Sequence, residues 1–183
     1  MLKLKLIKGL VTLAAMALSM SSHSAETVAR DKYVFASVSF VAPDSGRDAR
    51  AGEGAGLGLS LPVGELWNLD LRVDRSTVGV SGESAKFRLD AYAIDMRHQF
   101  STYKAFRHYW VAGLGLQKTN ITKLSGSSIL YNVGLGTQYL LHNDMQLRLD
   151  LRYRRDEFSQ WRDEAGFGDI VVSLSLDIPL GMN

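Results

Sequence analysis

Several features common in other proteins are missing from this sequence. It has no cysteine, so disulfides and thiolate metal sites are excluded. It also lacks an excess of one charge. The formal net charge is +2, and Lys3, Lys5 and Lys8 lie in an N-terminal segment that we expect to be removed. Without those lysines the net charge falls to about −1, so nothing in the charge indicates nucleic acid as a partner.

Nucleotide-binding motifs are absent as well, although glycine-rich pentapeptides occur as GLGLS at 56–60, GLGLQ at 113–117 and GLGTQ at 134–138. A dinucleotide site needs G-x-G-x-x-G between a strand and a helix, and a P-loop needs a lysine after its last glycine. Neither pattern occurs. From Gly52 to Gly58 a glycine stands at every second residue, which is the period of one strand face. We therefore predict strand centres here and expect no cofactor.

The N-terminal segment MLKLKLIKGLVTLAAMALSMSSHSA, residues 1–25, has the layout of a secretory signal peptide. A basic start is followed by an apolar stretch from about Leu10 to Met20 and by small residues before Glu26. The apolar stretch is too short to cross a bilayer as an ordinary helix. We expect cleavage after Ala25, with Ser24 as the near alternative, and one mature domain over residues 26–183.

The mature chain has no sustained helical periodicity, and apolar and polar residues alternate along its whole length. This pattern predicts an all-β protein with eight strands. The predicted strands cover 31–42, 54–61, 66–75, 86–99, 106–117, 128–141, 144–154 and 167–178.

The predicted connections alternate in length. Those at 43–53, 76–85, 118–127 and 155–166 are long and polar, whereas those at 62–65, 101–105 and 142–144 are short. Long loops at one end and short turns at the other are typical of up-and-down barrels in bacterial outer membranes. We expect the long loops to be extracellular and both ends of the mature chain to be periplasmic.

The two faces of each predicted strand differ in chemistry. In LRLDLRYR at 147–154, apolar residues occupy one face and alternating Arg and Asp residues the other. The glycines of the pentapeptides share the polar face, where missing side chains make room inside a narrow eight-stranded barrel. Buried charges are costly unless they are paired, so we predict a connected ionic network that plugs the lumen.

These arguments assign residues to the two sides of the barrel wall. The predicted ionic network consists of Asp70, Arg72, Asp95, Arg97, Arg148, Asp150 and Arg152. The predicted lumen glycines are Gly56, Gly58, Gly113, Gly115, Gly134 and Gly136. The residues predicted to face outer-membrane lipid are Leu57, Leu114, Leu135 and Leu149.

Aromatic residues gather toward both ends of the predicted strands, as expected for belts at two membrane interfaces. The belt predicted at the short-turn end consists of Tyr33, Trp67, Phe100, Tyr103, Phe106 and Tyr139. The belt predicted at the long-loop end consists of Phe40, Phe87, Tyr131, Tyr153 and Phe158.

Three segments carry a resemblance to a known family: YVFASVSFVAPDSGRDARAGEGAGLGLSLPVGELWNLDLRVD at 33–74, YWVAGLGLQ at 109–117 and YNVGLGTQYLLHNDMQLRLDLRYR at 131–154. The chain resembles the N-terminal transmembrane barrel of OmpA-type outer-membrane proteins over nearly its whole mature length. The resemblance implies an eight-stranded antiparallel barrel whose charged interior mostly obstructs permeation. It also implies a structural or surface-interaction role in the bacterial envelope.

The sequence departs from the family pattern at its C-terminal end. It stops at Asn183 without a peptidoglycan-binding domain, so a tether to the cell wall is not expected. The last predicted strand ends in SLDIPLGMN, without the terminal aromatic residue typical of such barrels. Recognition by the barrel assembly machinery would then rest on Ile178 or Leu180.

An enzyme is the main alternative from a different class, because some small outer-membrane barrels use histidine as a general base. His98, His108 and His142 all fall at the short-turn end, which we expect to be periplasmic. Lipid A and surface substrates lie at the other end, so we expect no catalytic residues and no metal site. A narrow channel for small solutes and a soluble periplasmic barrel that binds an apolar ligand remain as further alternatives. No particular partner of the surface loops is predicted.

Overall fold

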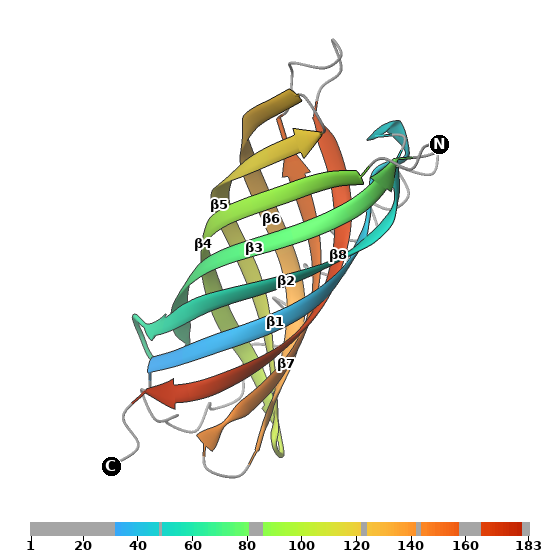
Figure 1. Cartoon of the computed structure of the whole chain (residues 1–183). Coiled ribbons are helices and arrows are strands. Elements are labelled where there is room, and N and C mark those ends of the chain that lie inside the picture. The colour runs from blue at the N-terminus through green and yellow to red at the C-terminus, as the bar shows by residue number, and fades with distance from the viewer. Residues whose placement is uncertain are drawn as a thin grey trace.

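Eight antiparallel strands form one closed barrel in the computed structural model, which describes residues 32–47, 49–80, 86–121, 124–141, 144–157 and 166–180 (Figure 1). Each strand pairs with its neighbours in the sequence, and β1 pairs with β8 to close the barrel. A short 3-10 turn, η1 (Ser45–Arg47), follows β1. The strands are β1 (Lys32–Ala42), β2 (Ala49–Pro62), β3 (Trp67–Val80), β4 (Lys86–Tyr103), β5 (Phe106–Ile121), β6 (Leu124–Leu140), β7 (Gln146–Asp156) and β8 (Phe167–Leu180). The predicted all-β, eight-stranded, up-and-down architecture is confirmed.

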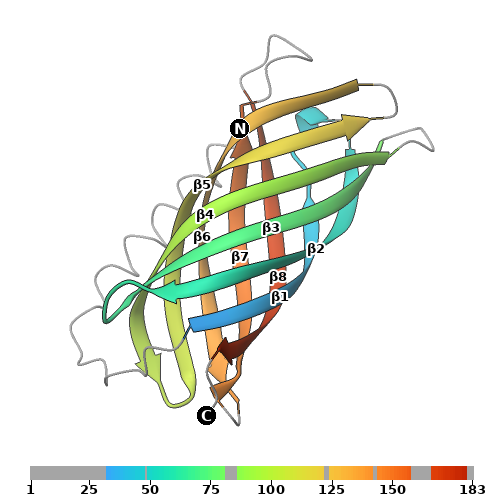
Figure 2. The same cartoon turned by 60° about the vertical axis from the view of Figure 1, so that its left-hand side comes forward.

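The two ends of the barrel are defined by the pairing of β1 with β8. Lys32 pairs with Leu180, so the first strand begins where the last one ends. The connections at 63–66, 104–105 and 141–145 lie at this end, which we call the turn end. The opposite end of the barrel, where β2 begins at Ala49 and β3 ends at Val80, is the loop end (Figure 2). The predicted signal peptide, His142 and Phe158 lie outside the described residues.

At the loop end the predicted bounds of β1, β4 and β8 agree with the structure, whereas β2, β3, β5, β6 and β7 run further than expected. β2 begins at Ala49 rather than 54, β3 continues to Val80 rather than 75, and β5 and β6 leave only 122–123 between them. The expected contrast between long loops and short turns is therefore lost for most connections, and 157–166 is the long one that remains. The physical reason is that ladder hydrogen bonds join backbone groups, so polar residues continue to pair after the apolar outer face has ended.

Side chains alternate across the barrel wall, as a strand requires. In β7 the burial pattern is strictly alternating over most of its length, with Arg148, Asp150 and Arg152 inside and Leu149 and Leu151 exposed outside. The polar face therefore forms the interior and the apolar face forms the outer surface. This arrangement is the inverse of a soluble barrel and argues against the alternative of a soluble periplasmic protein. No helix of the described residues is long and apolar enough to cross a membrane.

The interior is not charged throughout. Near the loop end, Val41, Val78, Leu89 and Val171 form a buried apolar cluster, against which Phe87 packs. Phe87 was predicted for the outer aromatic belt, and this prediction was wrong because its position on β4 shares the inward face with Leu89. Near the loop end the lumen thus combines an apolar cluster with buried polar residues such as Asp156 and Asp169, and most of the charged residues lie closer to the turn end.

Candidate functional site

The charged residues predicted to form a network all point into the barrel, and their side chains come from β3, β4 and β7. Each is less than a tenth exposed, from 0% for Asp70 and Asp95 to 5% for Arg72. The structure brings them together in two connected groups, one centred on Asp70 and the other on Asp95.

The first group surrounds the carboxylate of Asp70. Arg148 approaches it from the opposite wall, with Nη1 donating to Oδ2 at 2.8 Å. Arg97 lies on the neighbouring strand, with its Nε 3.4 Å from the same carboxylate, and its Nη2 donates to Ser60 at 2.8 Å. Arg148 also reaches Asp177 on β8 at 3.0 Å. Arg148 therefore links the carboxylates of β3 and β8 across the barrel, and Arg97 shares the first of them.

The second group surrounds Asp95. Its carboxylate accepts hydrogen bonds from Arg152 Nη1 at 2.6 Å and from Asn132 Nδ2 at 2.8 Å, and Arg72 lies 3.3 Å away. Arg152 contacts Asp150 at 3.4 Å on its own strand. This group combines β3, β4, β6 and β7 in one network.

Further interior side chains extend the network beyond the predicted set. Asp74 pairs with Arg72 at 2.9 Å and with Arg154 at 3.0 Å. The Tyr109 hydroxyl donates to Asp150 at 2.7 Å, and its ring lies 5.2 Å from the Arg97 guanidinium carbon, so Tyr109 joins the two groups. Asp74 and Arg154 could have been added from the strand pattern, since each lies two positions from a predicted member. Tyr109 could have been placed inside by the same rule, since it lies four positions from the predicted lumen glycine Gly113 on the same strand.

Two aromatic side chains of β1 also line the interior. Phe35 is 3% exposed, and its ring lies 4.4 Å from the guanidinium carbon of Arg148. Tyr33 was predicted for the outer belt, and this prediction was wrong because it is 6% exposed and shares the inward face with Phe35. The register explains the placement: Phe35 is the cross-strand partner of Gly58, which leaves space for the ring.

The predicted lumen glycines adjoin these large side chains. A Cβ on Gly113 would strike the Asp95 carboxylate, and one on Gly134 would lie 2.9 Å from Arg152 Cγ. A Cβ on Gly56 would clash with the Asp74 carboxylate. A Cβ on Gly58 would clash with the Phe35 ring, and one on Gly136 with the Tyr109 ring. At Gly115 the obstacle is the backbone, namely the carbonyl oxygen of Tyr92 and Cα of Ala93. Glycine is needed at these positions for space.

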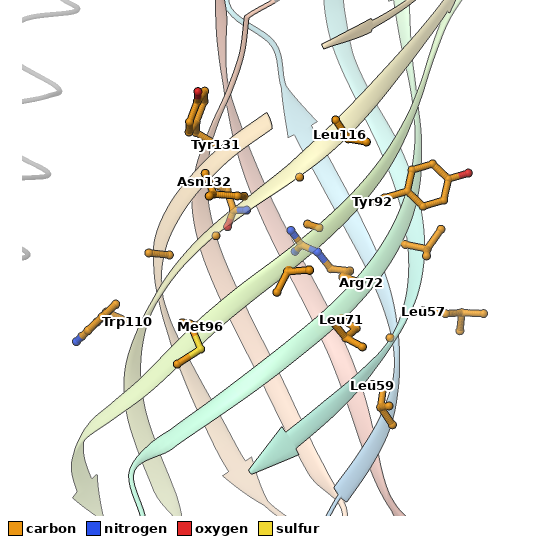
Figure 3. Close-up of a pocket in the computed structure, with 18 of the residues that line it drawn as sticks. Leu57, Leu59, Leu71, Arg72, Tyr92, Met96, Trp110, Leu116, Tyr131 and Asn132 are labelled. Carbon is orange, nitrogen blue, oxygen red and sulfur yellow. The ribbon is translucent and has the colours of Figure 1, made fainter. Parts of the chain in front are cut away.

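The outer wall is apolar. Leu57, Leu114 and Leu149 are 66%, 59% and 49% exposed, and Leu135 is half-buried where it pairs with Trp110. An open groove over β2 to β6 is lined mainly by outward apolar side chains, among them Leu57, Leu71, Tyr92, Met96, Trp110 and Leu116 (Figure 3). The structure therefore places all four predicted lipid-facing leucines on the outer side.

The described histidines lie among aromatic rings near the turn end. His98 stands between Trp67 and Trp110 in one cross-strand row, with ring centroids 4.4 and 5.6 Å away. His108 stacks on Phe100 at 6.5 Å. The buried Nδ1 of His98 has no hydrogen-bond partner among the described residues, and no group of three potential metal ligands occurs there.

Comparisons with known proteins agree on the fold. The family described as "Outer membrane protein beta-barrel domain" matches residues 10–177. Among solved structures, Neisserial surface protein A (NspA) matches with a TM-score of 0.68 and 15% identity, covering 81% of this chain and 97% of that chain.

Two other solved structures are similar to the chain. The outer membrane enzyme PagL has a TM-score of 0.54 and 16% identity, with 80% and 99% covered. The N-terminal β-barrel domain of Pseudomonas aeruginosa OprF has a TM-score of 0.50 and 15% identity, with 81% and 98% covered. No curated protein sequence matches. At these identities the structural likeness concerns the fold alone.

Proposed function

The chain belongs to the outer-membrane β-barrel family as an OmpA-type barrel, and we propose that it is a non-enzymatic barrel with a plugged interior that serves envelope structure or surface contact. Its place is the bacterial outer membrane, where the apolar outer face meets lipid. The observation that carries the proposal is the ionic network across the waist of the lumen.

The network supports a plug because its charges are paired and dry. Arg148 is 1% and Arg152 2% exposed, and both bind carboxylates from other strands at 2.8 Å or less. Arginines that line a water-filled channel would keep exposed guanidinium groups. Fully buried ion pairs persist only where partners satisfy them, so opening a continuous aqueous path requires breaking these pairs.

The surroundings of the histidines support a role without catalysis. A general base needs a hydrogen-bonded nucleophile or water, and a further group usually orients its ring. His98 and His108 contact aromatic rings instead, at the outer wall near the turn end. The likeness to the enzyme PagL is one of fold, at 16% identity.

The strand extensions support an orientation with the loop end outside the cell. On β3, β4 and β5 the outer face changes from apolar at Val73, Tyr92 and Leu116 to charged at Arg75, Asp90 and Lys118. The strands continue beyond this change to Val80 and Ile121. Such barrels usually have short periplasmic turns and longer extracellular segments, so we take the end where the strands run past the apolar band as the extracellular one.

The same orientation puts the end of β8 in the periplasm, where barrel assembly begins. Ile178 and Leu180 face outward, with 44% and 47% exposure. We assign recognition by the barrel assembly machinery to this apolar pair.

Single-barrel conductance in planar bilayers tests the proposal. The parent protein should give small or rare conductance steps. Arg148→Ala together with Arg152→Ala should increase the conductance, because this pair of changes removes the cross-barrel bridges to Asp70 and Asp95 and leaves the Arg154–Asp74 bridge between β7 and β3 in place. Arg75→Ala with Arg88→Ala removes two arginines from the outer face and should leave conductance unchanged. Large, steady steps from the parent protein would instead support the alternative function, a narrow channel for small solutes.

A further inference from the structure

A cationic cluster lies on the outer wall just beyond the apolar band. Cross-strand pairing aligns Arg75 on β3, Asp90 on β4 and Lys118 on β5 in one row. The preceding row toward the turn end contains Val73, Tyr92 and Leu116, which are all exposed and face the same side. The change from apolar to charged side chains therefore occurs within one step of the ladder.

Asp90 holds two arginines in place at this boundary. Arg75 Nε donates to Oδ1 at 2.6 Å, and Arg88 Nε donates to Oδ2 at 3.2 Å. The Asp90 side chain is 10% exposed, whereas those of Arg75 and Arg88 are 62% and 52% exposed. Their terminal amino groups make no hydrogen bond within the part of the chain that the structure describes. The adjacent Lys118 is exposed.

We propose that Arg75, Arg88 and Lys118 bind the phosphate group of a membrane lipid headgroup. Asp90 stands among the three cations and Glu53 lies beside Arg75 on the neighbouring β2, so three cations face two carboxylates and the cluster keeps a positive charge. Because Asp90 fixes each guanidinium through Nε, the terminal amino groups of both stay available for the planar, two-pronged contacts that arginine makes with phosphate. The exposed Tyr92 ring in the preceding row suits the headgroup level of a bilayer.

The position of the cluster at the edge of the apolar outer face favours a lipid headgroup, rather than free phosphate, as the ligand. Headgroups lie where the apolar face of a membrane barrel ends, and the cluster begins at that level. The assignment to the outer leaflet rests on the proposed orientation, and it points to a phosphorylated glycolipid. Binding itself depends on the cluster alone and can be measured in micelles, where neither orientation nor conductance plays a part.

The test uses the full mature barrel, folded in a neutral detergent and titrated with diphosphoryl lipid A, with bound lipid counted by native mass spectrometry. The variant Arg75→Gln/Arg88→Gln removes the two arginines. Lys32→Gln/Lys104→Gln is the matched control, because it removes the same charge from exposed positions at the turn end. Arg75→Lys/Arg88→Lys keeps the charge and loses the guanidinium geometry. Migration of unboiled protein on a gel verifies folding of each variant.

The Gln variant should bind diphosphoryl lipid A at least about tenfold more weakly than the parent, on the scale of charged hydrogen bonds, and the control should bind like the parent. The Lys variant should bind diphosphoryl lipid A several-fold more weakly than the parent, and all variants should bind fully dephosphorylated lipid A equally.

Equal binding of diphosphoryl lipid A by the Gln variant and the control would overturn the proposed site. Parent-like binding by the Lys variant would overturn the role of guanidinium geometry and leave net charge as the cause of binding. Competition by inorganic phosphate at similar affinity would overturn the assignment of the site to a lipid. If the Gln variant does not fold, Arg88→Gln alone carries the same comparison.

Discussion

Replacing Asp95 by alanine should destabilise the barrel strongly, because Asp95 is the meeting point of the second ionic group. The side chain is fully buried and joins Arg72, Arg152 and Asn132. Its removal leaves two buried arginines with one fewer carboxylate between them and opens space among the buried side chains of the lumen.

The structure sets the size of the effect. Breaking a buried ion pair by removing one partner costs about 3–5 kcal/mol. Arg152 keeps Asp150 at 3.4 Å and Arg72 keeps Asp74 at 2.9 Å, so neither cation is left alone. We therefore expect a loss in the free energy of unfolding at the lower end of that range, about 3 kcal/mol.

Asp90→Ala is the matched control for this prediction. Asp90 lies on the same strand and also bridges two arginines, but its partners are 62% and 52% exposed on the outer wall. Pairs of this kind contribute about 1 kcal/mol or less. Both variants would be unfolded with urea from lipid vesicles at equilibrium. Their free energies of unfolding would be compared with one shared m-value, the slope of that free energy against urea concentration. Losses for Asp95→Ala no larger than for Asp90→Ala would refute the idea of a dry, plugged lumen, because a hydrated waist would solvate the orphaned arginines.

Three further predictions concern the wall and the cellular location. Leu114→Arg puts a cation on the outer face near mid-strand and should cost about 2–4 kcal/mol in vesicle unfolding; an unchanged free energy of unfolding would refute the placement of Leu114 against lipid. Gly115→Leu should cost about 1–3 kcal/mol by overpacking, since a Cβ there lies 3.0 Å from Ala93 Cα; parent-like stability would contradict the lumen assignment. The mature protein should begin near Glu26, fractionate with the outer membrane and migrate differently on gels before and after boiling, and recovery from the soluble periplasm would contradict this.

The sequence predicted the two faces of the wall but not the lengths of the strands. Leu57 and Leu114 face outward and Gly113 adjoins Asp95, as period-two alternation indicates. The stretches at 49–53 and 76–80 were expected in loops and are strands, although 76–80 contains Val78 of the buried apolar cluster. Polarity marks where the apolar band ends, whereas strand pairing continues as long as the backbone ladder does.

The sequence also predicted which charges lie inside, but not their partners. Spacing along a strand suggested pairs two residues apart, and Arg72–Asp74 and Arg152–Asp150 are of this kind. The short contacts across the barrel join residues far apart in the chain, such as Arg148 with Asp70 at 2.8 Å.

What the sequence by itself determined is therefore the class of fold, the sidedness of the wall and the membership of most of the ionic network. These follow from the pleat, which sends successive side chains to opposite faces wherever a strand forms. Only the tertiary structure decided that Tyr33 and Phe35 point inward, that Tyr109 joins the two ionic groups, and that Asp90 binds both Arg75 and Arg88 on the outer wall. Closure of the barrel sets the register between strands and the stagger around the ring, and these geometric quantities have no local trace in the order of residues.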